Sequence, residues 1–351
     1  MKWRLEPISA FERHAGDWDR LNNARGGSVL QGGAFITPLL REFAQGDERL
    51  AIGSDAGGIQ VMTIVRQDRR GAWSTFQPSQ APIGLWVQAA GLDMVELAAS
   101  LVPALPGAAL LLGIQQMDPD LRERPATNGR TATQDYIQTA RVTLDGSFDD
   151  YWAKRGKNLR QNMKKQANRL EREGMATRLE RITDPAQVPA AIADYGRLES
   201  AGWKSDTGTA VHPDNAQGRF YTALLADFIT AGRGAIYRYW YGDTVVAMDL
   251  CIEGAEEMII LKTTYDESIR DTSPAFLMRH EYFPQLFAEA RLKRIEFYGK
   301  LMEWHTRWSD EVRTLYHVNV YRWGFLPKLR DMLKRNRPAA DTPAENLGDA
   351  S

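Results

Sequence analysis

Two stretches of the chain show the same order of hydrophobic patterns. Each has three short strand-like segments separated by turn residues, then a helical pattern and one more apolar strand. The first stretch predicts these five elements at 49–52, 58–66, 73–77, 92–101 and 108–114. The second predicts them at 235–241, 244–253, 256–265, 274–290 and 294–297. We infer an internal repeat of architecture, because the halves share element order rather than residue identity.

A strongly basic helix is predicted between the two stretches. Ser147, followed by Asp149 and Asp150, is typical of a helix start. Apolar residues fall near one face of a helix over 154–172, which Gly174 ends. Its cations are Lys154, Arg155, Lys157, Arg160, Lys164, Lys165, Arg169 and Arg172. Two interpretations stay open: a solvated amphipathic helix, or a helix whose Lys157, Arg160 and Lys164 bind an anionic substrate.

The whole pattern predicts a mixed α/β protein of two tandem domains. The 351 residues suffice for two cores of roughly 150 residues each. Each domain is expected to be a mixed, mostly antiparallel sheet flanked by helices, over residues 1–146 and 147–336. The second domain also contains helices at 186–200, 215–231 and 327–334 and a strand at 312–320. Residues 337–351, rich in Pro, Ala, Asp and Glu, are predicted to be a disordered tail.

Charge and composition exclude several classes of protein. Lys and Arg number 44 against 45 Asp and Glu, so the chain as a whole has no electrostatic reason to bind DNA, and any basic site is local. The single cysteine, Cys251, fits a reducing compartment. The N-terminus lacks the apolar run of roughly 7–15 residues that a secretory signal needs, so a cytoplasmic location is expected. Two prolines and a glycine interrupt the apolar stretch 97–113, which argues against a membrane span.

Common catalytic motifs are missing from the sequence. Gly156-Lys157 lacks the flanking residues of a phosphate-binding P-loop, and G-x-G-x-x-G, G-x-S-x-G and H-E-x-x-H do not occur. The five histidines have no metal-ligand spacing, so no metal site is expected. What stands out is a helix that begins at Pro274, with Ser273 as its predicted cap. Free N–H groups at such a helix start can hold a pyrophosphate.

The sequence resembles the GNAT acyltransferase superfamily. Within that superfamily it resembles the cellulose-biosynthesis CelD-like branch, which is related to the tandem FemABX transferases. Six segments carry the resemblance: 157–165 (KNLRQNMKK), 170–174 (LEREG), 198–204 (LESAGWK) with 208–209 (GT), 265–266 (YD), 273–274 (SP) and 297–300 (FYGK). The resemblance implies an acetyl- or other acyl-coenzyme A donor and an amine or sugar acceptor, a precursor of a surface polysaccharide. It also implies a pantetheine arm along a splayed strand and a pyrophosphate at Thr272, Ser273, Ala275, Phe276 and Leu277.

The chain departs from this family pattern in two places. Ala275 and bulky Phe276 stand where a small glycine is usual, which is expected to narrow the phosphate loop. Glu303-Trp304-His305 replaces the usual Tyr-Lys pair. Two other functions stay open: a FemABX-type transfer of an aminoacyl group from transfer RNA, with the basic helix facing the RNA, and a catalytically inactive binding or scaffold protein.

Direct attack on a thioester needs a base and a proton donor to the leaving thiolate. Asp249 interrupts an apolar strand face, and with a turn at 254–255 Lys262 falls diagonally beside it, so Asp249 is interpreted as a base or as half of an ion pair with Lys262. Tyr265, Tyr298, Glu303 and His305 are candidates for proton transfer near the strand ends.

Other polar and aromatic residues are candidates for the acceptor side. Trp203 and Lys204 suit a wall for a sugar or an anion, although Trp203 equally suits a core position, and Lys300 joins Tyr298 as a further binding candidate. Nucleic acid is considered only at the basic helix. The aromatic residues of the C-terminal region are interpreted as domain packing rather than base stacking: Trp304, Trp308, Tyr316, Tyr321, Trp323 and Phe325.

Overall fold

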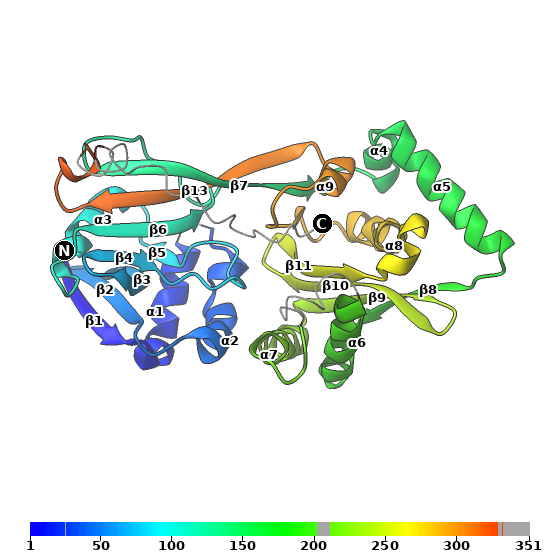
Figure 1. Cartoon of the computed structure of the whole chain (residues 1–351), viewed down its shortest axis with the longest axis horizontal. Helices are drawn as coiled ribbons and strands as arrows, with labels where there is room; N and C mark the ends of the chain where they lie inside the picture. Colours follow the sequence, from blue (N-terminus) through cyan, green and yellow to red (C-terminus); the bar gives the residue numbers. More distant parts are fainter. Residues whose placement is uncertain (25, 202–210, 329–331, 333–351) are drawn as a thin grey trace. The chain divides into compact units, whose positions relative to one another are not determined.

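Two units of the chain each contain a sheet with helices packed against it (Figure 1). The computed structural model describes residues 1–24, 26–201, 211–328 and 332. Unit 1 comprises residues 1–138 and the segment from Arg313 onward, and unit 2 comprises Thr139–Val312. Two strands run from one unit into the other: β7 (Thr131–Thr143) and β13 (Glu311–Tyr321).

The sheet of unit 1 has the order β1-β2-β3-β4-β6-β13, with β5 beside β3. Its strands are β1 (Lys2–Pro7), β2 (Arg49–Asp55), β3 (Gly58–Arg69), β4 (Ala72–Thr75), β5 (Trp86–Gln88) and β6 (Leu111–Met117). Its helices are α1 (Phe11–Asn23), α2 (Gly33–Phe43) and α3 (Met94–Leu101). The Asp93 side chain accepts the N–H of Glu96 at 2.9 Å and so caps α3. Only β4 and β6 run parallel; the other neighbours are antiparallel.

The sheet of unit 2 has the order β12-β11-β10-β9-β8, with the end of β7 beside β12. Its strands are β8 (Thr177–Ile182), β9 (Gly234–Tyr241), β10 (Thr244–Glu253), β11 (Glu257–Tyr265) and β12 (Arg294–Glu296). Its helices are α4 (Phe148–Ala153), α5 (Lys157–Arg172), α6 (Val188–Ala201), α7 (Ala216–Thr230), α8 (Pro274–Glu289) and α9 (Glu303–Trp308). Here α8 covers one face of the sheet, and α6 and α7 cover the other (Figure 1).

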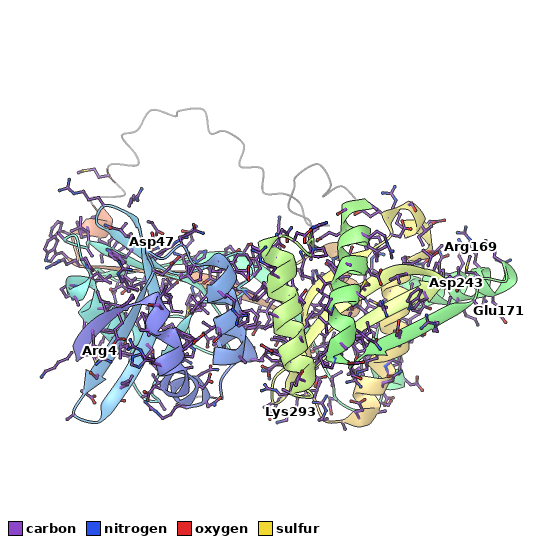
Figure 2. All side chains as sticks on the ribbon, turned by 90° about the horizontal axis from the view of Figure 1, so that it is seen from below. Arg4, Asp47, Arg169, Glu171, Asp243 and Lys293 are labelled. Atoms are coloured by element: carbon purple, nitrogen blue, oxygen red, sulfur yellow. The ribbon has the colours of Figure 1, made fainter. Side chains whose placement is uncertain are left out.

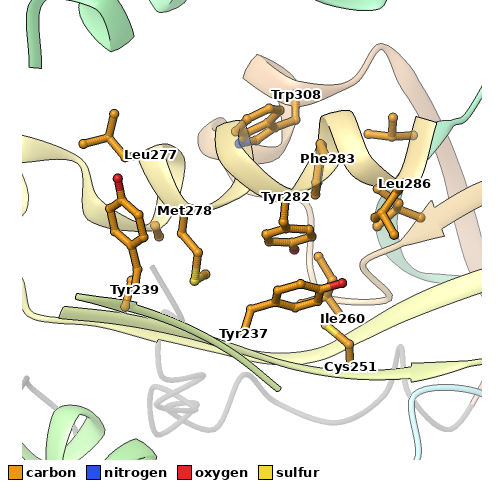
Figure 3. Close-up of a cluster of buried hydrophobic side chains, with 14 of the residues drawn as sticks. Tyr237, Tyr239, Cys251, Ile260, Leu277, Met278, Tyr282, Phe283, Leu286 and Trp308 are labelled. Atoms are coloured by element: carbon orange, nitrogen blue, oxygen red, sulfur yellow. The ribbon is translucent and has the colours of Figure 1, made fainter. Parts of the chain in front are cut away.

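Helix α8 is fixed to its face of the sheet by aromatic packing (Figure 3). The rings of Tyr237 on β9 and Tyr282 on α8 stack with centroids 3.9 Å apart. Met278 and Phe283 are fully buried beside them, and so is Trp308. Because large aromatic side chains bury much apolar surface, this cluster holds the N-terminus of α8 at a defined place above the strands.

The predicted fold class is confirmed, and the predicted elements of both repeats occur in the predicted order. The prediction does not include β1, β5, β7, β8, α1 and α2, and β5 lies between β4 and α3. In each unit an antiparallel hairpin pair is followed by a helix and then by a short strand parallel to the last hairpin strand. Ser147 caps α4 through the N–H of Asp150, and Gly174, with φ of 67°, ends α5. The units divide at 138/139 and 312/313 rather than at the predicted 146/147, because β13 pairs with β6 of unit 1. The predicted tail, 337–351, lies outside the described residues.

Candidate functional site

Strands β11 and β12 begin as neighbours and then separate. They pair in parallel only over Glu257–Ile259 and Arg294–Glu296. Strand β11 then continues to Tyr265 beside β10, whereas Phe297 donates its N–H to the carbonyl of Ala140 near the end of β7. Among the described residues, no strand pairs with the other edge of β11 beyond Ile259. The backbone groups of this edge are therefore placed to bind an extended ligand.

The corresponding strands of unit 1 separate too, but chain fills the place between them. Strands β4 and β6 pair over Ala72–Ser74, and residues 76–85 then leave the sheet before β5 rejoins β3. The N–H of Gly84 donates to the carbonyl of Gln116 at 2.9 Å, and a Cβ on Gly84 would lie 2.1 Å from the carbonyl oxygen of Gln115. Ile83 and Leu85 are fully buried. This segment occupies the end of β6 in unit 1, so unit 2 is the better candidate for a ligand site.

Helix α8 starts directly after the loop that follows β11. Ser273 adopts the left-handed conformation (φ 56°, ψ 52°), and its carbonyl accepts the N–H groups of Phe276 and Leu277 at 3.0 and 3.1 Å. Pro274 has no N–H, and no hydrogen bond from the N–H of Ala275 is found within the described residues. The N–H of Ala275 is therefore placed to bind an anion at this helix end. The predicted capping by the Ser273 side chain is wrong, because no side-chain cap bond forms there.

Phe276 does not narrow this loop, contrary to the expectation from its size. Its ring stacks on Trp308 with centroids 5.5 Å apart and an interplanar angle of 21°, so it belongs to the core. Thr272 is also buried, and its hydroxyl lies 3.2 Å from the hydroxyl of Tyr241. The start of α8 is thus formed by Ser273, Pro274 and Ala275, with aromatic packing beneath them.

Helix α5 lies beside the start of α8. The amide nitrogen of Asn162 is 3.4 Å from Oγ of Ser273, and Arg169 pairs with Asp271 at 2.8 Å. Arg169 also pairs with Glu173 at 2.9 Å, and these two carboxylates raise its pKa. Figure 2 labels Arg169 and Glu171 of α5 at this end of the unit.

The cations of α5 divide between two sides of the helix. At 100° per residue, Lys165 lies on the same side as Asn162, which touches the α8 start. Arg160 and Lys164 lie on the opposite side, and Lys157 also points well away from it. All four cations are exposed, and no ion pair to them occurs among the described residues. Of the predicted anion-binding residues, Lys157, Arg160 and Lys164 therefore do not face the helix start, whereas Lys165 does.

Asp249 is fully buried at the centre of a hydrogen-bonded network. Arg279 donates to both of its oxygens at 2.9 Å, and the hydroxyls of Thr263 and Tyr282 donate at 2.5 and 2.8 Å. Burial by itself lowers the pKa of Arg279, but the charges of Asp249 and Tyr282 and the hydrogen bonds to both together outweigh it, so the pKa rises overall. Both ionic partners are at most 1% exposed. This environment favours a structural ion pair that joins β10, β11 and α8.

The predicted pairing of Asp249 with Lys262 is wrong. The turn between β10 and β11 is longer than predicted, since Glu253 pairs with Met258. A bulge between Leu250 and Cys251 then shifts the pairing of the two strands. Thr263 therefore lies opposite Asp249, and Lys262 lies opposite Leu250 on the other face of the sheet. A small change in register moves a side chain to the opposite face, because successive residues of a strand alternate.

Lys262 instead forms an ion pair with the buried Glu199, which the sequence interpretation missed. Its ammonium is 3.1 Å from Oε1 of Glu199, and it lies 5.8 and 5.6 Å from the ring centroids of Tyr195 and Tyr221. The other oxygen of Glu199 accepts the N–H of Val211 at 2.7 Å. In the sequence, a residue of such a buried ion pair can be recognised as a charge on the apolar face of a helix. Glu199 follows Ile192 and Tyr195 on the buried face of α6, and Arg279 lies among the buried residues of α8.

His305 is buried next to the separating strands, while Glu303 is not. Nδ1 of His305 accepts the N–H of Met302 at 2.9 Å, and its ring stacks on Trp304 with centroids 3.5 Å apart. Burial, with the charge of Arg279, lowers the pKa of His305 to about 3, so its ring is neutral at pH 7 and carries its proton on Nε2. Glu303 is exposed, and its hydrogen bond with Arg307 lowers its pKa.

The remaining predicted residues lie in different surroundings. Tyr265 ends β11 half-buried, and burial raises its pKa. Tyr298 is buried with a positive φ of 49°, and Lys300 is exposed two residues later. Trp203 and Lys204 lie outside the described residues. Tyr265 ends β11, and Tyr298 and His305 lie in the segment that follows β12. Glu303, by contrast, points to solvent.

Part of unit 2 is similar in sequence to a known family. Residues 157–306 match the family described as acetyltransferase (GNAT) domain, which covers α5 to α9. No curated protein matches the sequence. The family match supports a transferase and leaves the CelD-like branch as a prediction.

Solved structures share the fold over most of the chain. The C-terminal DUF2156 domain of a protein named as a lysylphosphatidylglycerol synthetase, from Agrobacterium fabrum, is 17% identical with a TM-score of 0.54, covering 91% of this chain and 95% of that one. L-PGS from Bacillus licheniformis is 13% identical with a TM-score of 0.52, covering 91% and 96%. FemX is 10% identical with a TM-score of 0.55, covering 91% and 98%. At these identities the likeness shows the fold alone.

Proposed function

We propose that unit 2 transfers an acyl group from a coenzyme A thioester to an amine or hydroxyl of a small-molecule or saccharide acceptor, in the biosynthesis of a surface polysaccharide. One observation carries this proposal: the edge of β11 that pairs with no strand of the described residues leads through residues 266–272 to the start of α8. An extended pantetheine arm can bond the strand edge while its pyrophosphate meets the N–H of Ala275. Lys165 supplies a cation on the same side.

The reaction needs no covalent intermediate on the protein. The acceptor nitrogen or oxygen attacks the thioester carbon and the C–S bond breaks. The proton that the acceptor loses ends on the leaving thiolate, so the products are the acylated acceptor and coenzyme A. The neutral ring of His305 is suited to donate a hydrogen bond from Nε2 where negative charge develops. Gly299 lies beside this nitrogen, since a Cβ at that position would be 3.9 Å from it. Tyr265 is the second candidate donor, at the end of β11.

Asp249 acts in this proposal through Arg279. Its carboxylate has no exposed surface and already accepts four hydrogen bonds, so contact with an acceptor is sterically blocked in this conformation. The Asp249–Arg279 ion pair fixes α8 against β10 and β11. It thereby holds the start of α8 at a constant position relative to the edge of β11. Asp249 is therefore proposed as a positioning residue.

A second candidate function is transfer of an aminoacyl group from transfer RNA, which the FemABX resemblance implies. The observation that favours it is the outward side of α5, where Lys157, Arg160 and Lys164 are exposed. A row of exposed cations suits a long polyanion better than a single cofactor. The two candidates thus assign different sides of the same helix to the donor.

Calorimetry with acetyl-coenzyme A and with aminoacyl-transfer RNA tests the donor. We expect one coenzyme A site per chain, because residues 76–85 fill the matching place in unit 1. Ser273→Asp is expected to abolish binding, since it adds negative charge at the helix start. Ser273→Asn is the matched control: both side chains tolerate the left-handed conformation and the N-cap position, but Asn is neutral.

Each result has a defined meaning. Equal loss of binding in both Ser273 variants would contradict a phosphate at the start of α8. Binding of aminoacyl-transfer RNA without acetyl-coenzyme A, weakened by Arg160→Gln, would establish the second candidate. Binding of neither donor by the folded wild type would indicate a binding or scaffold protein.

A further inference from the structure

Two large aromatic side chains are exposed next to each other just after β13. Trp323 is 47% exposed and Phe325 is 59% exposed, and their rings stack with centroids 5.9 Å apart and an interplanar angle of 7°. The interpretation of the C-terminal aromatic residues as packing holds for Trp308, Tyr316 and Tyr321, which are buried, and is wrong for this pair. Adjacent exposed aromatic rings are unusual on a protein surface and mark an interaction site.

Cations surround this pair. The guanidinium of Arg322 lies 5.3 Å from the ring centroid of Trp323, and Lys328 is exposed three residues after Phe325. Leu110, whose carbonyl accepts the N–H of Arg322 at 2.8 Å, is also exposed. We call these five residues the aromatic–basic patch. It belongs entirely to unit 1 and shares no residue with the proposed donor site.

The sequence that continues from the patch is strongly basic. From Arg322 to Arg337 it contains six Lys and Arg residues and a single acid, Asp331, although the whole chain has a net charge of −1. Between these cations stand Leu326, Leu329, Met332 and Leu333. Such a combination of basic, aromatic and aliphatic residues is the composition of segments that lie in the interface of an anionic membrane.

The geometry of the pair favours a lipid surface over RNA. Trp323 and Phe325 already stack on each other, so a base has no gap between them, whereas the stacked pair presents one continuous apolar body. Indole and phenyl rings enter the headgroup region readily, and neighbouring Arg and Lys side chains meet lipid phosphates. None of the helices in the described part of the chain is long and apolar enough to cross a bilayer.

We propose that the aromatic–basic patch binds the surface of a membrane that contains anionic phospholipids. Trp323 and Phe325 insert among the headgroups, and Arg322 and Lys328 supply the attraction to negative charge. This inference does not depend on the donor or the acceptor of unit 2. It would place an enzyme of either proposed kind next to membrane-bound substrates.

Co-sedimentation of the full chain with vesicles tests the proposal. We expect binding to phosphatidylcholine vesicles that contain phosphatidylglycerol, weak binding to pure phosphatidylcholine, and release by added salt. The double variant Trp323→Ser/Phe325→Ser is expected to bind at least about tenfold more weakly, with an unchanged melting temperature. Met175→Ser is the matched control, because Met175 is a 41% exposed apolar side chain of unit 2, outside the patch.

Three outcomes would overturn the proposal. One is no sedimentation with phosphatidylglycerol vesicles even at low salt. Another is equal sedimentation of the wild type and the double variant. The third is a dimer or an RNA complex that the double substitution abolishes while vesicle binding is unchanged.

Discussion

Replacing Asp249 with Asn separates a structural role from a catalytic one. Asn keeps the size of the side chain but removes its charge, so Arg279 stays buried without its counter-charge. Arg279 is 1% exposed, and relaxation toward water is therefore restricted. Breaking a buried ion pair in this way costs about 3–5 kcal/mol, because an uncompensated charge is left in a low-dielectric environment.

This cost corresponds to a large shift in thermal stability. For a domain of the size of unit 2, 1 kcal/mol changes the melting temperature by about 2–4 °C, so we expect a decrease of about 6–20 °C. The double variant Asp249→Asn/Arg279→Met is expected to recover part of this loss, since no unpaired charge remains. Thermal unfolding followed by circular dichroism measures all three proteins.

Asp243→Asn provides the matched control. Asp243 lies in the exposed turn between β9 and β10 (Figure 2), and its substitution is expected to change stability by no more than about 0.5 kcal/mol. The structural interpretation fails if Asp249→Asn melts with the wild type and turnover falls by something like the 10²–10⁴-fold of a lost general base. That result would restore Asp249 as a catalytic base.

Three further predictions concern charged and titratable groups of unit 2. Lys165→Gln is expected to weaken acetyl-coenzyme A binding roughly fivefold and to flatten the salt dependence of that binding. Lys164→Gln, on the far side of α5, is the control and is expected to leave the affinity and its salt dependence unchanged. If calorimetry gives the same affinity for the two variants, the donor binds elsewhere. Lys262→Met removes the ammonium 3.1 Å from buried Glu199, so the melting temperature is expected to fall by about 5–10 °C, and Glu199→Gln in the same chain to restore part of it. The folded-state pKa of His305, about 3, lies below the unfolded value, so stability is lost as pH falls through the unfolded pKa. Between pH 7 and pH 5, His305 lowers the free energy of unfolding by about 2 kcal/mol. Urea unfolding at both pH values is therefore expected to show a decrease that is about 2 kcal/mol smaller for His305→Asn than for the wild type.

Local patterns in the sequence determined the elements of the fold and much of their order. Strand β10 begins and ends where the sequence predicts it, at Thr244 and Glu253, because turn residues bound a run of apolar and β-branched residues on both sides. Pro274 marks the start of α8 for the same kind of local reason, since its fixed φ and missing N–H suit a first helical position. The repeat of these elements in both halves was likewise readable before any contact was known.

Only the tertiary structure decided which charges meet and which surfaces stay open. The partner of Asp249 is Arg279 rather than Lys262 because turn length and a bulge set the strand register, and no local pattern fixes either. The filling of unit 1 by residues 76–85 and the exposure of Trp323 likewise depend on segments distant in sequence. Secondary structure follows from neighbours along the chain, whereas pairing and burial follow from neighbours in space, and the chemistry of this protein depends on the second kind.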